Sequence, residues 1–102
     1  MKVRIAVFLD SLEHVEIDNG LKFVLLFDVD RDIIIAAGRQ IMAIYNLSYL
    51  ITWLIGKRVE EVYINNRDEK LKAKIEKSGI RVYPLNKIKD NPLLESLKLP
   101  LD

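Results

Sequence analysis

Three apolar, β-branched runs fill most of the first 37 residues and constrain the fold of this chain more than any other feature. They cover residues 3–9, 21–27 and 33–37. Runs of this length, bounded by polar and turn-forming residues, predict buried strands. The acidic segment 28–32 joins the second run to the third, so we expect these two strands to form an antiparallel hairpin. Gly38 is expected to end the third strand.

Helical and strand periods alternate in the rest of the chain. An asparagine stands at the expected N-cap of each of three helices, namely Asn46, Asn66 and Asn91. Gly56 is expected to end the first of these helices, while residues 39–45 fit neither period and are expected to form a loop. The remaining predicted elements are a helix over 47–55, a strand over 59–64, a helix ending at 78–79, a strand over 80–83 and a helix from 92 through 97.

This order of elements, β-β-β-α-β-α-β-α, predicts an α/β fold with a mixed five-stranded sheet. A hairpin followed by β-α-β crossovers places helices on the sheet. The 102 residues, half of them hydrophobic, are enough for one core and one domain. We expect that domain to span 1–98 and the residues 99–102 to form a C-terminal tail.

Composition and charge exclude several classes of site. The chain has no cysteine, which rules out disulfides, zinc–thiolate sites and thiolate-held clusters. The formal net charge of +1 gives no general attraction to nucleic acid or to an anionic membrane. No apolar run approaches the ~18 residues of a membrane span, and acidic residues follow the first run at once, which is unlike a signal peptide. We therefore expect a cytoplasmic protein without membrane contact.

Polar residues near the predicted strand ends are candidates for binding a ligand. In α/β sheets, ligands bind beyond the strand ends, where backbone N–H groups are accessible. The arginines among the candidates would complement an anion. The alternative is that these residues form ordinary turns and helix caps. The candidates are Asp18, Asn19 and Gly20 after the first strand, Arg39 after the third, and Asn65, Asn66 and Arg67 after the fourth.

His14 is the one histidine and the one candidate metal ligand of its kind. Imidazole nitrogen binds many metals, but neither a second histidine nor a cysteine exists to share an ion. The alternative is a solvated loop residue beside Glu13 and Glu16. Asp28, Asp30 and Asp32 have the spacing that opens a calcium loop, but the glycine and glutamate that such a loop needs further on are missing, which favours a turn.

Four stretches of the chain resemble one known family. They are KVRIAV at 2–7, LLFDVD at 25–30, LITWLIG at 50–56 leading into VEEVYI at 59–64, and residues 71–75 leading into SGIRVY at 78–83. In this order they are similar to the dinitrogenase iron–molybdenum cofactor biosynthesis family, which is NifX-like and related to the C-terminal domain of NifB. Where family members often carry a His-Phe-Gly-like signature, this chain has Asp18-Asn19-Gly20, so only the glycine matches.

The resemblance implies an RNase H-like fold and a non-enzymatic carrier of an iron–molybdenum or iron–sulfur type cluster, held by loops at one edge of the sheet. It implies His14 as a metal ligand and a protein partner in cofactor assembly. A two-metal nuclease is not expected, because the fourth strand and the first helix offer no convincing acidic partners for Asp10. The alternative is a divergent member without cofactor that acts as a protein–protein interaction module. A homodimer also stays open, since Tyr49 and Trp53 could form an association patch.

Overall fold

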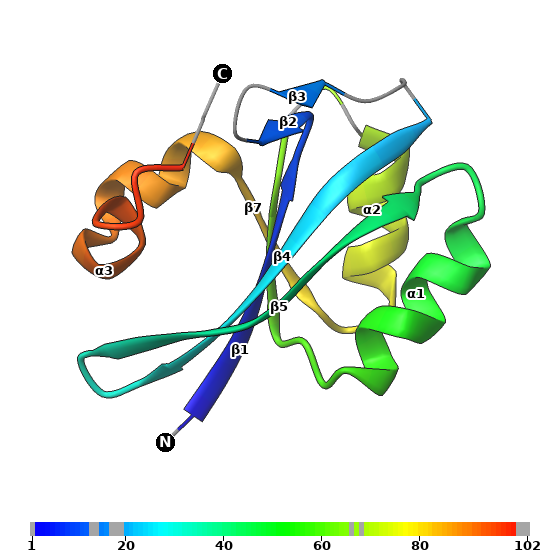
Figure 1. Ribbon diagram of the computed structural model, residues 1–102. Helices are drawn as coiled ribbons and strands as arrows, with labels where there is room; N and C mark the ends of the chain where they lie inside the picture. The colour runs from blue at the N-terminus through cyan, green and yellow to red at the C-terminus, as the bar shows by residue number, and fades with distance from the viewer. Residues whose placement is uncertain (1, 13–14, 17–19, 66, 68, 100–102) are drawn as a thin grey trace.

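The computed structural model describes residues 2–12, 15–16, 20–65, 67 and 69–99 (Figure 1). No helix among these residues is long and apolar enough to cross a bilayer. The elements are, in chain order, β1 (Lys2–Leu9), β2 (Ser11–Leu12), β3 (Val15–Glu16), β4 (Leu21–Asp30), β5 (Ile33–Ala43), α1 (Leu47–Gly56), β6 (Glu61–Ile64), α2 (Glu69–Lys77), β7 (Arg81–Pro84), the 3-10 helix η1 (Leu85–Asp90) and α3 (Pro92–Glu95).

One mixed sheet organises the molecule, in the order β5-β4-β1-β6-β7. The strands β1, β4 and β5 pair antiparallel, whereas β1, β6 and β7 pair parallel. The expected α/β class, the five strands and the main order of elements are therefore confirmed. A second, two-stranded sheet of β2 and β3 was not expected from the acidic stretch that contains it.

Helices cover both faces of the sheet, which gives three layers (Figure 1). Alternate residues of β1 enter different cores: Ala6 and Phe8 belong to the cluster beneath α1 and α2, while Ile5, Val7 and Leu9 belong to the cluster beneath η1 and α3. A strand buried on both faces needs apolar side chains in both directions. This explains the continuous apolar run that makes β1 visible in the sequence.

The N-terminal cap of α1 is the residue that the sequence predicted, whereas the C-terminal end of the helix differs in part from the prediction. Asn46 caps the helix by accepting the N–H of Tyr49 at 3.1 Å. The helix ends at Gly56 as expected, but Arg58 rather than the glycine adopts the left-handed conformation, with φ of 58°. The N–H of Val59 reaches the carbonyl of Leu54 at 3.1 Å, the 6→1 bond of a Schellman motif.

The expected loop over 39–45 is wrong for most of its length, because β5 continues through Gly38 to Ala43. Leu26 pairs with Gly38 and Phe27 with Ala36, so a β-bulge at Ala37 interrupts the register instead of ending the strand. The hairpin connection is also shorter than 28–32, since β4 runs to Asp30. All seven residues 35–41 are exposed, so this strand shows no alternation of burial that a periodicity could reveal.

The C-terminal region keeps the predicted cap but not the predicted helix. The Asn91 side chain accepts the N–H groups of Leu93 and Leu94, yet α3 ends at Glu95 rather than at residue 97. The preceding η1 was not expected. Leu99, assigned to the tail by the sequence, packs partly buried against the cluster beneath η1 and α3. The predicted cap Asn66 lies outside the described residues.

Candidate functional site

The predicted ligand residues are divided between one edge of the sheet and its outermost strand. Strands β1 and β6 are parallel and end at the same edge, where β4 begins; we call this the upper edge (Figure 1). Gly20 and Asn65 lie there. Arg39 does not, because it pairs with Leu25 in the middle of β5, so its expected position at a strand end is wrong. The other candidates, His14, Asp18, Asn19 and Asn66, lie outside the described residues.

A groove of about 530 Å³ opens at the upper edge, between the start of α1 and the start of α2. We call it the upper groove. Its cations are Arg67 and Lys70, and its most exposed large side chain is Tyr45, at 79% exposure. The lining residues are Ile44, Tyr45, Leu47, Arg67, Glu69, Lys70 and Leu71.

Gly20 and Asn65 do not line the groove themselves but contact residues that do. The Gly20 carbonyl accepts the N–H of Ile44 at 2.9 Å, and a Cβ atom at Gly20 would stand 3.2 Å from the Tyr45 ring. The Asn65 side-chain oxygen accepts the backbone N–H of Arg67 at 3.0 Å and its Nε–H at 3.4 Å. Three predicted residues thus converge: Gly20 leaves room for Tyr45, and Asn65 holds Arg67 in place.

Two groove residues, Tyr45 and Lys70, escaped sequence reasoning. Tyr45 stands in the segment that was expected to be a featureless loop, and Lys70 belongs to a lysine-rich helix whose charges are typical of a solvated face. The one available signal was the position of Tyr45 directly before the Asn46 cap, which places it beside the start of a helix.

An ion pair between Lys22 and Asp10 closes the β1–β4 ladder at the upper edge. The Lys22 side chain is buried, whereas the Asp10 carboxylate is 44% exposed. A buried ammonium group requires a charged or polar partner. This pair therefore keeps a lysine within the apolar face without a large loss of solvation for the carboxylate.

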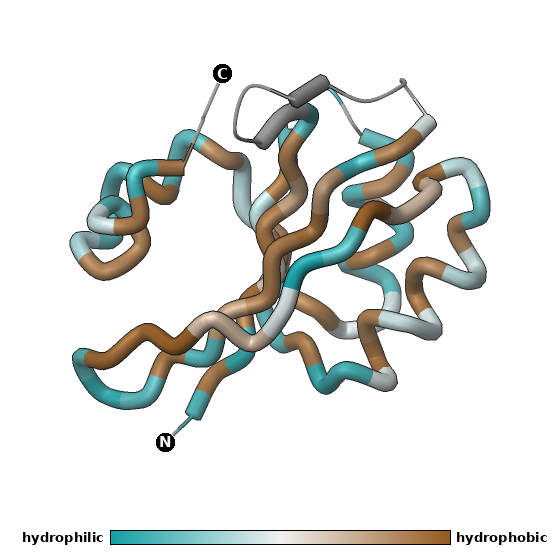
Figure 2. The backbone as a smooth tube through the Cα atoms, viewed as in Figure 1, coloured by the Kyte–Doolittle hydropathy of each residue, from teal (hydrophilic) through white to brown (hydrophobic). Residues whose placement is uncertain are grey.

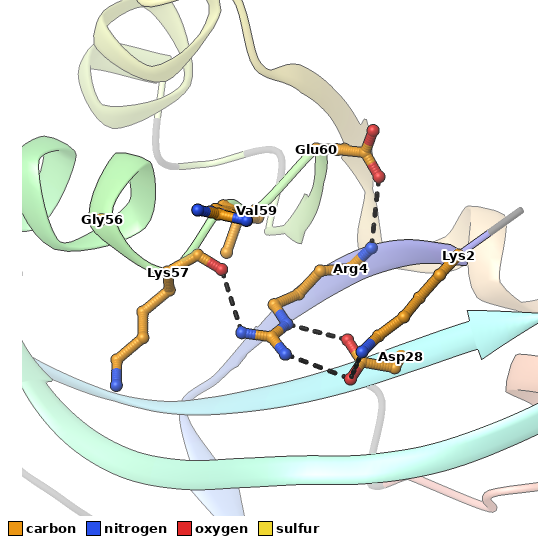
Figure 3. Close-up of a pocket in the computed structure, with 8 residues that line it drawn as sticks. Lys2, Arg4, Asp28, Gly56, Lys57, Val59 and Glu60 are labelled. Carbon is orange, nitrogen blue, oxygen red and sulfur yellow. Dashed lines mark hydrogen bonds and ion pairs between the residues drawn. The ribbon is translucent and has the colours of Figure 1, made fainter.

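A larger hollow, about 820 Å³, lies at the opposite edge, where β1 begins and α1 ends (Figure 3). We call this the lower pocket. Arg4 occupies its centre and donates through Nε and Nη2 to the two carboxylate oxygens of Asp28, at 2.8 and 3.1 Å. Its Nη1 donates to the Lys57 carbonyl at 3.1 Å. The lining residues are Lys2, Arg4, Asp28 and the five residues from Gly56 to Glu60.

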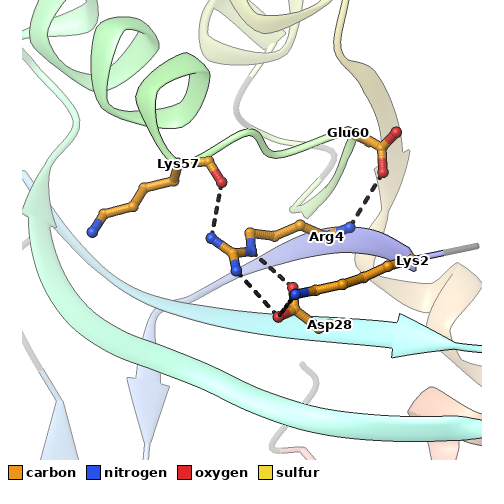
Figure 4. A network of polar contacts seen from close by, with 5 residues as sticks. All are labelled: Lys2, Arg4, Asp28, Lys57 and Glu60. Atoms are coloured by element: carbon orange, nitrogen blue, oxygen red, sulfur yellow. Dashed lines mark hydrogen bonds and ion pairs between the residues drawn. The ribbon is translucent and has the colours of Figure 1, made fainter.

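Contacts within the protein satisfy the charges at the centre of this pocket (Figure 4). The Arg4 guanidinium, by hydrogen bonding, lowers the pKa of the Asp28 carboxyl from its ordinary value, and Lys2 at 3.3 Å adds to the effect against the opposing effect of burial. Asp28 in turn raises the pKa of Arg4. The backbone N–H of Arg4 also donates to Glu60 at 3.3 Å.

The charged groups of the lower pocket therefore connect structural elements and are poorly suited to binding an anion. Arg4 ties β1 to β4 and to the last turn of α1, and the carbonyl end of a helix carries partial negative charge that disfavours anions. In the upper groove, by contrast, Arg67 and Lys70 lie near the start of α2, whose N–H groups attract negative charge.

Within the described ranges, no three histidine or acidic side chains come together in a way that would hold a metal ion. The three aspartates with calcium-loop spacing occupy different positions in the hairpin. Asp28 binds Arg4 within β4, Asp30 ends that strand and Asp32 follows in the turn.

Comparison with known proteins identifies a fold and nothing finer. No protein-family model matches the chain, and no curated protein matches it. Among solved structures, the crystal structure of PH0822 is similar, with a TM-score of 0.53 over 98% of this chain and 96% of that chain. At 11% identity this similarity shows a shared α/β fold alone.

Proposed function

We propose that this chain is a non-enzymatic binding protein that holds an anionic ligand in the upper groove. The observation that carries the proposal is the convergence of Tyr45, Arg67 and Lys70 on one hollow, with Gly20 and Asn65 behind them. Cations beside an exposed aromatic ring, near a helix N-terminus, suit a bulky ligand with delocalised negative charge.

The family resemblance supports a metal cluster as the cargo. In sequence pattern the chain is similar to carriers of iron–molybdenum or iron–sulfur type clusters, and such clusters are anionic. An RNase H-like fold is part of the same proposal, supported by the β-β-β-α-β-α-β-α order and by the hairpin joined to parallel β-α-β units. The resemblance also suggests a protein partner that delivers or receives the cargo.

The groove lining combines two cations with one carboxylate, that of Glu69, so its net charge is positive and suits an anionic cluster held mainly by charge. With no cysteine in the chain, no thiolate can bind iron. His14, by the resemblance, would supply a nitrogen ligand from the loop that precedes Gly20. Arg67 and Lys70 would donate charge-assisted hydrogen bonds to the cargo, each contributing about 1.5–3 kcal/mol, or about 10- to 150-fold in affinity.

Anaerobic titration of the cofactor-free protein tests this proposal. An iron–molybdenum cofactor and a [4Fe–4S] cluster are added separately while the charge-transfer absorbance is followed. We expect Arg67→Ala and Lys70→Ala each to weaken binding by about tenfold or more. The matched control is Lys57→Ala, which removes a lysine beside the lower pocket and should bind like the wild type. His14→Ala tests the metal ligand separately.

Equal binding by the wild type, Arg67→Ala and Lys70→Ala would contradict the assignment of the groove. The absence of binding by the wild type would favour the alternative, a protein–protein interaction module without cofactor. One observation favours that alternative independently of the groove: the outermost strand β5 is exposed along most of its length.

A further inference from the structure

Among the residues that the structure describes, the outer strand β5 pairs with β4 alone and leaves its other edge open. A strand covered by helices on one face buries every second residue, but in β5 all seven residues 35–41 are exposed. Neither helix layer therefore covers its middle. In an antiparallel ladder, every second residue directs its N–H and C=O groups away from the neighbouring strand, so this edge presents a row of backbone hydrogen-bonding groups.

The open edge has little of the usual protection against pairing beyond the bulge at Ala37. Its eleven residues, IIIAAGRQIMA, contain one charge, Arg39, and no lysine or proline. Ile33 and Ile35 are 61% and 58% exposed, and the start of β5 is among the most hydrophobic stretches of the chain (Figure 2). Long, apolar edge strands of this kind pair with another strand unless charge, proline or a covering segment prevents it.

We propose that β5 pairs antiparallel with β5 of a second copy of this chain, with Ile35 on the two-fold axis. The two sheets then join into one ten-stranded sheet. This inference concerns a different part of the molecule from the ligand groove and does not depend on it.

The size and direction of the side chains favour this register. Ile33, Ile35 and Gly38 lie on the same face as Asp30, Asp28 and Leu26, their partners in β4, while Ala36 lies on the opposite face with Phe27. A two-fold axis perpendicular to the sheet preserves the faces. With Ile35 opposite its own copy, Ile34 stands opposite Ala36 on one face.

The bulge at Ala37 then sets Ile33 opposite Gly38 on the other face. Large residues thus meet small ones on both sides of the axis. A strand with large residues in one half and small residues in the other is complementary to an antiparallel copy of itself.

Charge is also complementary in this arrangement. Asp32, the turn residue directly before β5, then lies one step beyond the Ile33–Gly38 pair and close to Arg39 of the other copy, so two symmetric pairs of opposite charge flank the apolar centre. Opposite charges across a pair of strands stabilise a register, whereas like charges destabilise it. The net charge of +1 per chain adds little repulsion between two copies.

Single-cysteine crosslinking tests the proposal, and a chain without cysteine makes the result unambiguous. Opposed residues in an antiparallel pair have Cα atoms about 4.5–5.5 Å apart, within the range of a disulfide. Ile35→Cys should therefore form a disulfide-linked dimer under mild oxidation. The matched control is Ile55→Cys, at a site of nearly equal exposure (56%) on α1.

We expect at least about tenfold more crosslinked dimer from Ile35→Cys than from Ile55→Cys at equal concentration, because prior association raises the effective concentration of the two thiols. Sedimentation of the wild type should give the mass of two chains, and Ile35→Lys should give the mass of one while keeping the wild-type circular dichroism spectrum. A monomeric wild type over the whole concentration series, or equal crosslinking of both cysteine variants, would overturn the proposal.

A charge exchange tests the register. Asp32→Arg places cations opposite Arg39 and should raise the dissociation constant of the dimer by about tenfold or more. Adding Arg39→Asp in the same chain should restore the wild-type value. If the double variant dissociates as readily as the single one, Ile35 does not lie on the axis.

Discussion

An ion pair lies at each end of the β1–β4 ladder, but the cation belongs to β1 at one end and to β4 at the other. At the lower end Arg4 of β1 pairs with Asp28 of β4, and at the upper end Asp10, just after β1, pairs with Lys22 of β4. Between them lie apolar pairs such as Ala6–Leu26 and Phe8–Val24, all on the face beneath α1 and α2. Each ion pair therefore closes one end of the same core.

The ends differ in how deeply their carboxylates are held. The Asp28 side chain is 11% exposed and accepts two hydrogen bonds from Arg4 besides its contact with Lys2, whereas Asp10 is 44% exposed and pairs with Lys22. A bidentate contact between arginine and a buried carboxylate is stronger than a single contact to a solvated carboxylate. We infer that the lower ion pair contributes more to the stability of the fold than the upper one.

Removing the core between the two ends should have the largest effect. Leu54 is part of α1, and its fully buried side chain belongs to the apolar cluster that lies between the two ion pairs. Leu54→Ala should lower the free energy of unfolding by about 2–5 kcal/mol, because it leaves a cavity in a closed core. Chemical denaturation measures this. The neighbouring exposed residue provides the control, and Ile55→Ala should change stability by less than about 0.5 kcal/mol. Similar losses in both variants would mean that the helix face is assigned wrongly.

Breaking the lower ion pair should have the next largest effect. Asp28→Asn removes the charge that Arg4 and Lys2 share, and we expect a loss of about 1–3 kcal/mol in the free energy of unfolding. Asp90→Asn is the control, because it breaks the exposed pair of Lys87 and Asp90 at 3.6 Å and should cost little. Urea denaturation of the three proteins at neutral pH compares them. Equal midpoints for Asp28→Asn and the wild type would show that the bidentate contact contributes nothing.

A pH series sharpens the comparison, because the pKa of Asp28 is lowered in the folded protein. A lowered pKa means that ionised Asp28 contributes stability above its unfolded pKa of about 3.9, and that this contribution is lost as the pH falls through the folded value. The stability difference between the wild type and Asp28→Asn should therefore be constant above about pH 5 and shrink below about pH 4. A difference that persists unchanged into the acid range would contradict this origin of the stabilisation.

Breaking the upper ion pair should have the smallest effect. We expect Asp10→Asn to cost about 0.2–1 kcal/mol, since Asp10 is well solvated and the amide oxygen of the introduced asparagine still accepts from Lys22. Thermal or urea unfolding beside Asp28→Asn gives the ranking. A larger loss from Asp10→Asn than from Asp28→Asn would reverse this ranking of the two ion pairs.

Sequence patterns predicted the covered part of the sheet well and the open part poorly. The strands β1, β4 and β6 contribute buried residues to both core clusters, so burial imposed apolar runs that are visible in the sequence. Residues 39–41 of β5 are exposed, so burial does not require apolar side chains there. Their mixture of Arg39, Gln40 and Ile41 therefore resembled a loop. In the candidate site, Asn65 and Arg67 could be found from their place after a strand, whereas Tyr45 and Lys70 come from segments that meet only when α1 and α2 pack.

The sequence by itself determined the order of the main elements and the asparagine caps of α1 and α3. Those features depend on periodicity and on hydrogen bonds within a few residues. Only the tertiary structure decided that Arg4 meets Asp28, that Arg67 shares a groove with Tyr45, and that β5 remains open. The physical reason is distance along the chain. Arg4 and Asp28 are 24 positions apart, and no local propensity selects which polar side chains the strand register will place opposite one another.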